Sequence, residues 1–79
     1  MSKSQILIID DDQNMRTTMS DILELKGYQV IIARSGEQGL AELAQHEVEV
    51  AVIDLRLDDM NGLEVLKAIK KDSPETECI

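Results

Sequence analysis

Aromatic residues are almost missing from this sequence. The 79 residues contain one Tyr and neither Phe nor Trp, although hydrophobic residues make up 43% of the chain. A buried core must therefore be aliphatic, built from Ile, Leu, Val, Ala and Met. A chain of this length is close to the lower limit for a self-sufficient core, so we expect a single domain.

Cysteine and long apolar runs are also scarce. Cys78 is the only cysteine, so no disulfide can form within the chain and nothing indicates an oxidising compartment. The apolar run after Gln5 is far too short for a signal peptide, and no run approaches the length of a membrane span. We therefore expect a cytoplasmic protein that does not enter the membrane.

Basic residues are few. Lys and Arg number 8 against 16 Asp and Glu, which gives a formal net charge of −8. Nucleic acids and anionic membranes are bound mainly through cationic side chains, so this balance disfavours direct binding to either. It suits a bound cation or a basic partner, although a solvated acidic surface produces the same balance.

Three strand–helix units follow one another along the chain. Continuous apolar segments rich in β-branched residues, typical of strands covered on both faces, occur at residues 6–9, 30–33 and 50–53. Amphipathic segments follow each of them, beginning near residues 13, 36 and 62. Short connections between alternating strands and helices predict an α/β fold with a parallel sheet and right-handed crossovers.

The predicted helices have recognisable ends and inner faces. Asp12 is placed to cap the first helix, and Gly27 follows its last turn. Ser35 and Gln38 form a capping box for the second helix, and Pro74 follows the third. The residues expected to face inward are Met15, Met19, Ile22 and Leu23, then Leu40, Leu43 and Ala44, then Leu63, Leu66 and Ile69.

The last residues, Glu77-Cys78-Ile79, look like the start of a fourth strand. Each unit takes about 20–25 residues, whereas a five-unit doubly wound domain needs more than about 100. We therefore expect residues 1–79 to form a partial domain whose C-terminal part is missing. The third strand, at residues 50–53, would then have an unpaired outer edge through which two copies could form a homodimer.

Aspartates stand where two of the predicted strands end. Asp10 and Asp11 follow the first strand, and Asp54 closes the third. Sites in parallel α/β sheets lie at the C-terminal ends of the strands, so a strand order of 2-1-3 would bring these carboxylates together. Like charges in one pocket repel unless a cation neutralises them, and oxygen ligands at a half-open site suit Mg²⁺.

An aspartate after a strand, taken alone, is more often a turn residue or a helix cap than part of a site. Only the combination of the three aspartates favours a site. Asp10-x-Asp12 is similar to the motif of haloacid-dehalogenase phosphohydrolases, but Gln13 and Asn14 follow where that family usually has Thr or Val. The spacing required for a calcium-binding loop is not met, because the necessary Gly is absent.

Three segments carry a family resemblance. Residues 6–12 (ILIIDDD), 52–57 (VIDLRL) and 61–66 (NGLEVL) resemble the signature segments of receiver domains from two-component response regulators. The resemblance covers nearly the whole chain and implies a flavodoxin-like (CheY-like) fold. It implies that Asp54 is the phosphoacceptor and that Asp11 binds Mg²⁺ directly. It further implies that Asp10 binds the metal through water and that Arg56 offers its backbone carbonyl.

The resemblance also implies partners and shows departures. A sensor histidine kinase would donate the phosphoryl group, and an output domain or partner protein, not encoded here, would respond; the domain assists its own phosphorylation and is not an enzyme. Asp58 stands where the family usually has Pro, and Asn61-Gly62 replaces a frequent Asp-Gly. The Ser or Thr and the Lys expected on later strands lie beyond the sequence. The alternative is a phosphorylation-incompetent fragment that self-associates through its sheet edge.

Overall fold

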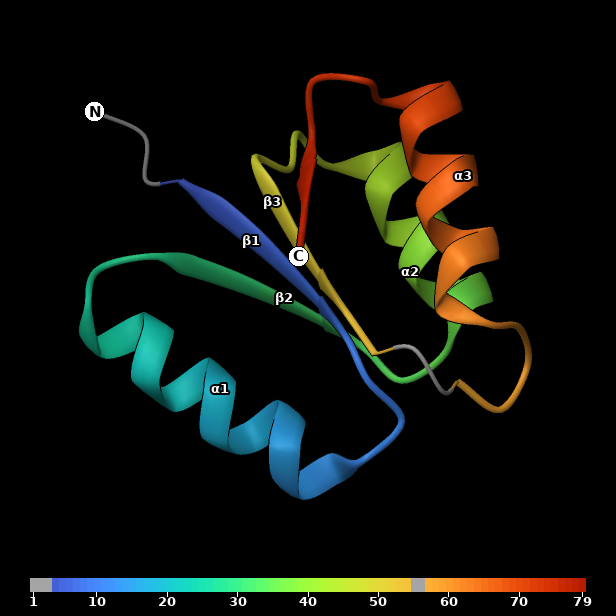
Figure 1. The fold of residues 1–79 in the computed structure, drawn as a ribbon. Helices are drawn as coiled ribbons and strands as arrows, with labels where there is room; N and C mark the ends of the chain where they lie inside the picture. The colour runs from blue at the N-terminus through green and yellow to red at the C-terminus, as the bar shows by residue number, and fades with distance from the viewer. Residues whose placement is uncertain (1–3, 55–56) are drawn as a thin grey trace.

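The strands of the structure are the aliphatic segments of the sequence, and the helices are the amphipathic segments between them. The computed structural model describes residues 4–54 and 57–79. Its elements are β1 (Gln5–Ile9), α1 (Gln13–Leu25), β2 (Gln29–Ala33), α2 (Gly36–Gln45), β3 (Val50–Ile53), α3 (Gly62–Asp72) and β4 (Glu77–Cys78), as Figure 1 shows. The predicted α/β class and the succession of three strand–helix units are confirmed.

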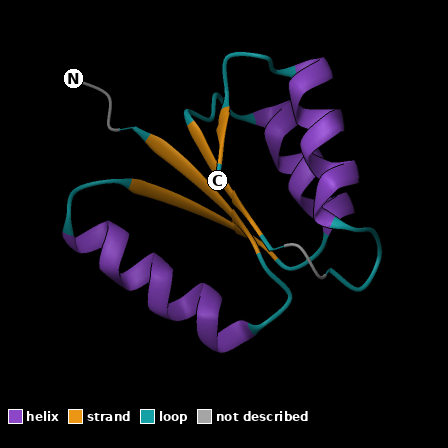
Figure 2. Cartoon of the chain, in the orientation of Figure 1, coloured by secondary structure: helices purple, strands orange, loops and turns teal. Residues whose placement is uncertain are grey.

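β1 lies in the middle of a parallel sheet. The strand order is β2-β1-β3-β4, so β1 has β2 on one side and β3 on the other (Figure 2). Ile9 pairs with Ala33 of β2 and with Ile53 of β3. The predicted order 2-1-3 is confirmed. This register brings the residues that follow β1 and β3 together at the C-terminal ends of the strands.

The outer edge of β3 is paired, so the expectation of an open edge was wrong. Val50 and Ala51 pair with β4, and the bonding continues beyond it. The Ile79 N–H donates to the Ala51 carbonyl at 2.9 Å, and the Ile53 N–H donates to the Ile79 carbonyl at 3.0 Å. The homodimer expected through this edge therefore loses its structural basis.

A buried hydroxyl helps to bring the chain back to β3. Thr76 is 1% exposed, and its Oγ1 donates to the Val48 carbonyl at 2.8 Å. Lys70 of α3 donates from Nζ to the Thr76 carbonyl at 2.6 Å. These two bonds join the end of α3, the approach to β4 and the start of β3, which explains why the last residues of the chain can extend the sheet.

The helices divide between the two faces of the sheet. α1 covers one face, while α2 and α3 pack side by side on the other (Figure 1). The main core lies between the sheet and the α2–α3 layer. Its buried members are Leu7, Ile9, Ala33, Leu43, Val48, Ala51, Val65 and Ile69. The core is aliphatic as expected, and Tyr28 lies outside it with 40% of its surface exposed. Within the described ranges, no helix is long and apolar enough to span a membrane.

The α1 face is less completely covered than the pattern predicted. Met19 and Leu23 are half-buried, but Met15 and Ile22 remain 48% and 50% exposed. Ile8 beneath the helix is fully buried. The expectation that all four α1 residues face inward was therefore wrong for two of them. Among the residues that the structure describes, α1 is the single helix on this face, so no second helix covers its flanks.

The inner face of α3 is displaced from the prediction. Leu63 is 59% exposed, whereas Val65 and Ile69 are fully buried. Asn61 caps the helix through a hydrogen bond from the Glu64 N–H to its Oδ1 at 2.9 Å. The inward expectation was wrong for Leu63, because the helix turns its Gly62, Val65 and Ile69 side toward the sheet.

α2 approaches the sheet through small residues. Leu43 is buried as expected and Leu40 is partly buried, but Ala44 is exposed, which corrects the prediction for it. Gly39 lies so close to β1 that an added Cβ would collide with Cδ1 of Ile9 and lie 2.7 Å from its Cγ1. Glycine at position 39 therefore sets how closely the helix packs on the central strand.

Candidate functional site

Main-chain hydrogen bonds fix two aspartates at the C-terminal ends of neighbouring strands. The Asp10 N–H donates to the Ala33 carbonyl at 3.0 Å, and the Asp54 N–H donates to the Ile9 carbonyl at 2.9 Å. These bonds continue the ladders of β1 with β2 and of β1 with β3 by one residue. Both aspartates therefore leave the sheet from defined positions, on neighbouring strands.

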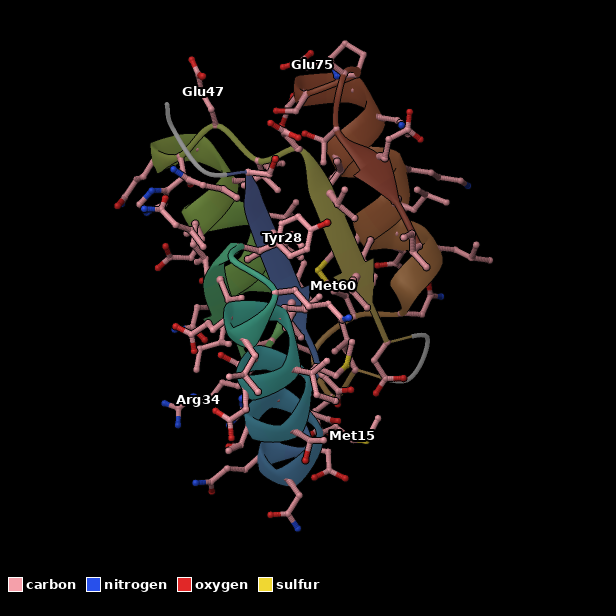
Figure 3. All side chains as sticks on the ribbon, turned by 90° about the vertical axis from the view of Figure 1, so that its left-hand side faces the viewer. Met15, Tyr28, Arg34, Glu47, Met60 and Glu75 are labelled. Atoms are coloured by element: carbon pink, nitrogen blue, oxygen red, sulfur yellow. The ribbon has the colours of Figure 1, made fainter. Side chains whose placement is uncertain are left out.

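The aspartates after β1 and β3 come together. One carboxylate oxygen each from Asp10, Asp11 and Asp54 lies within 4.8 Å of the others, and all three residues are half-buried. We call these three residues the acidic cluster. Because Asp10 and Asp11 directly precede α1, the cluster lies at the end of the molecule where α1 begins; Figure 3 shows Met15 at that end, and Glu47 and Glu75 at the opposite end. The sequence had singled out the same three residues.

Asp10 is held on three sides. Besides its N–H bond to β2, its Oδ1 accepts a hydrogen bond from the Asp12 N–H at 2.9 Å. Its carbonyl accepts a hydrogen bond from Nη1 of Arg16 in α1, at 2.8 Å. One carboxylate oxygen of Asp10 is thus engaged within the loop. The residue can orient the cluster, because its main chain and one of its side-chain oxygens are held by hydrogen bonds.

Asp12 does not belong to the cluster. Its Oδ1 accepts hydrogen bonds from the Asn14 N–H at 2.9 Å and from the Met15 N–H at 3.4 Å. This geometry makes Asp12 the N-cap of α1, as the sequence predicted. The run of three aspartates after β1 is therefore divided between two tasks, a cluster and a cap.

Asp58 is a further carboxylate at the site. The pKa of Asp11 is raised first by desolvation, then by the charge of Asp58 and a side-chain hydrogen bond with it, and then by the charge of Asp54. From the sequence, Asp58 was noted only as a departure from the usual Pro. The two adjacent acidic residues at positions 58 and 59 were the only sign in the sequence of a further carboxylate at the site. Which way their side chains point depends on the conformation of the loop, which the sequence pattern does not predict.

The donor set fits a small divalent cation. All the converging side-chain atoms are carboxylate oxygens, which Mg²⁺ prefers over nitrogen or sulfur ligands. The half-buried position and the mutual repulsion that raises the Asp11 pKa are conditions that a bound cation relieves. Arg56, whose carbonyl was expected to join the set, lies outside the described residues.

Comparison with known proteins assigns the family. Residues 6–79 match the family model of the response regulator receiver domain. The chain belongs to this family. Receiver domains are the phosphoacceptor modules of two-component systems, and the parallel sheet with the CheY-like strand order agrees with that assignment.

Individual relatives agree with this assignment. The photosynthetic apparatus regulatory protein RegA of Rhodobacter capsulatus is 37% identical over 78 residues, which cover 99% of this receiver chain and 42% of RegA. A CheY-like receiver domain protein from Methanospirillum hungatei JF-1 has a TM-score of 0.96 at 36% identity, with 98% of this chain and 62% of that one covered.

A third relative was solved with ligands. TrrA of Thermotoga maritima, in complex with Mg²⁺-BeF, has a TM-score of 0.90 at 27% identity, with 95% of this chain and 65% of that one covered. TrrA was also solved in complex with the histidine kinase ThkA. This receiver chain thus spans less than half of RegA and less than two thirds of these solved chains.

Proposed function

We propose that this receiver domain takes a phosphoryl group from a sensor histidine kinase onto Asp54, with Mg²⁺ bound at the acidic cluster, and thereby switches an output domain or partner protein in the cytoplasm. The observation that carries the proposal is the convergence of Asp10, Asp11 and Asp54 within 4.8 Å in a chain of the receiver family. The complex of TrrA with ThkA supports a kinase as the partner.

Asp54 is the proposed nucleophile. One of its carboxylate oxygens forms a bond to phosphorus while the bond from phosphorus to the imidazole nitrogen of the donor phosphohistidine breaks, and the electron pair leaves with that nitrogen. The Asp54 N–H is fixed to the Ile9 carbonyl at 2.9 Å, so the strand positions the carboxylate in advance. The product is an acyl phosphate on Asp54.

The proposed ligands of the cation are the oxygens of the acidic cluster and one main-chain carbonyl. We place Asp11 and Asp54 as direct ligands, Asp10 as a ligand through water, and the Arg56 carbonyl as a fourth contributor. The bond between Asp10 Oδ1 and the Asp12 N–H supports an indirect role for Asp10, because that oxygen is already engaged. When bound, Mg²⁺ neutralises the carboxylates and the charge on the phosphoryl oxygens. The TrrA complex with Mg²⁺-BeF supports this assignment.

Labelling of the full-length protein that carries this sequence tests the proposal. Incubation with a phosphorylated histidine kinase and Mg²⁺ should add one phosphoryl group, detected by intact mass, and Asp54→Asn should abolish it. Asp72→Asn, at the far end of α3, is the matched control and should be labelled like the wild type. Labelling that survives Asp54→Asn and disappears in Asp10→Asn would overturn the assignment and favour a phosphohydrolase-like nucleophile.

The self-associating fragment is not proposed as a second function. It required an unpaired β3 edge, and residues Glu77–Cys78 and Ile79 occupy that edge.

A further inference from the structure

The N-terminus of α2 is capped from a distant part of the chain. The first amides of a helix have no carbonyl partner within the helix. In α2 the Gln38 N–H donates to Ser35 Oγ at 3.1 Å, which is a local cap. The Gly36 and Glu37 N–H groups instead donate to Oδ1 and Oδ2 of Asp59, each at 2.9 Å. Both oxygens of this one carboxylate are used.

The next residue of the same loop packs on the same point. A Cβ added to Gly36 would collide with Cγ of Met60, lie 2.5 Å from its Sδ, and lie 3.0 Å from Cγ2 of Val65. Glycine at position 36 lets Met60 pack there, and any larger residue would require Met60 to shift. The loop after β3 is therefore attached to the first turn of α2, because Asp59 accepts hydrogen bonds from Gly36 and Glu37 and Met60 packs against Gly36.

The preceding residue of the loop faces the acidic cluster. Asp58 lies close enough to Asp11 for its charge, and a hydrogen bond between the two side chains, to raise the pKa of Asp11. Neighbouring Cα atoms are about 3.8 Å apart, so the position of Asp59 restricts where Asp58 can stand. Two adjacent carboxylates thus link different parts of the molecule, one to the cluster and the other to α2.

We propose that Asp59 is a positioning residue for the cation site: by holding the loop on the N-terminus of α2 it fixes Asp58 beside Asp11. The inference rests on the proposed function and adds a route by which the site acts on α2. Coupling between two sites is reciprocal. Cation binding at the cluster therefore stabilises the first turn of α2, as Asp59 favours cation binding.

The reciprocal effect is measured on the wild-type protein without any variant. Amide hydrogen exchange of Gly36 and Glu37 is followed by NMR with and without Mg²⁺, using the full-length protein. We expect Mg²⁺ to slow exchange at these two amides more than at Lys70 and Lys71, which lie at the far end of α3. A cap with a purely structural role leaves the Gly36 and Glu37 rates unchanged relative to those lysines, and that result overturns the inference.

The forward effect is measured with Asp59→Asn. We expect this variant to bind Mg²⁺ with a Kd about fivefold higher than that of the wild type. A fivefold change is at the low end of ordinary coupling between sites. Asp72→Asn removes an equal charge far from the loop and should bind like the wild type. A wild type that binds no Mg²⁺ contradicts the proposed function and this inference together. A wild type that binds, with unchanged affinity in folded Asp59→Asn, contradicts the inference alone.

Discussion

The guanidinium of Arg16 donates a hydrogen bond from Nη1 to the main-chain carbonyl of Asp10, at 2.8 Å. Arg16 belongs to α1 and Asp10 follows β1, so the bond ties the helix to the central strand where the acidic cluster begins. It also places a cationic side chain beside a group of carboxylates. The acidic cluster is therefore supported from the α1 face, whereas Asp59 supports the following loop from the α2 face.

Loss of the Arg16 bond should weaken the fold. We expect Arg16→Met, which keeps an unbranched apolar stem, to lower the free energy of unfolding by about 1–2 kcal/mol, because a half-buried bond from a charged donor is lost. Urea denaturation measures the change. The control is Arg34→Met, at an exposed position, with an expected change within about 0.5 kcal/mol. Equal losses in the two variants would mean that the bond contributes nothing specific.

Asp11→Asn should have opposite effects with and without Mg²⁺. Desolvation and the neighbouring Asp58 and Asp54 raise the pKa of Asp11, so its ionised form is unfavourable in the metal-free protein at neutral pH. The stability linked to this group is present below its ordinary pKa of 3.8 and is lost as pH rises through the folded pKa. The variant should therefore melt at a higher temperature than the wild type without Mg²⁺.

Added Mg²⁺ should reverse that order. At a concentration of about 100 times Kd, the wild type should gain about 2.7 kcal/mol, and Asp11→Asn should lose most of this gain. Thermal melts with and without Mg²⁺ measure both effects. A well-folded wild type whose melting temperature ignores Mg²⁺ would show that the cluster is not a cation site.

The contribution of Asp59 to the stability of the fold should depend on pH in the opposite direction to that of Asp11. Hydrogen bonds from the Glu37 and Gly36 N–H groups lower the pKa of Asp59 below its ordinary value of 3.8. A lowered pKa means that the stabilisation is present above 3.8 and is lost as pH falls through the folded pKa. The melting temperatures of wild type and Asp59→Asn should differ most near neutral pH and converge in acid. A difference that stays constant with pH would contradict this cause.

Gly39→Ala should destabilise the protein although alanine favours helices. Replacing glycine gains about 1 kcal/mol in helix propensity, but the added Cβ would collide with Ile9, and overpacking of this kind costs about 1–3 kcal/mol. We expect a net loss of about 1 kcal/mol in chemical denaturation. The control is Ala41→Gly on the exposed side of α2, which should lose about 1 kcal/mol through propensity alone. A more stable Gly39→Ala would show that Ile9 yields without cost.

Features that depend on near neighbours or on strand register could be predicted from the sequence. Asp12 caps α1 through bonds that span two or three residues, and Ser35 does the same for α2. The convergence of Asp10 and Asp54 required only the strand order, because residues that follow neighbouring parallel strands leave at one edge. These parts of the fold and the site follow from short-range rules.

Features that depend on tertiary placement could not be predicted. Leu63 and Val65 both fit a helical apolar pattern, and only the docking of α3 decides that Val65 is buried. Gln38 was expected to complete a capping box, but its Oε1 accepts from the Arg34 N–H at 2.9 Å instead. Asp59 reaches amides more than twenty residues away, a contact that no local pattern encodes.

The central position of β1 has a consequence during synthesis. β1 is the first strand of this segment to be made, yet its two partners, β2 and β3, come later in the chain. At ribosomal rates of about 5–20 residues per second, its aliphatic residues wait for seconds before β2 exists. The aspartates at positions 10 to 12 directly follow this strand. Charged residues beside such a segment act as gatekeepers against aggregation, so we expect these carboxylates to limit aggregation of the strand while it is unpaired.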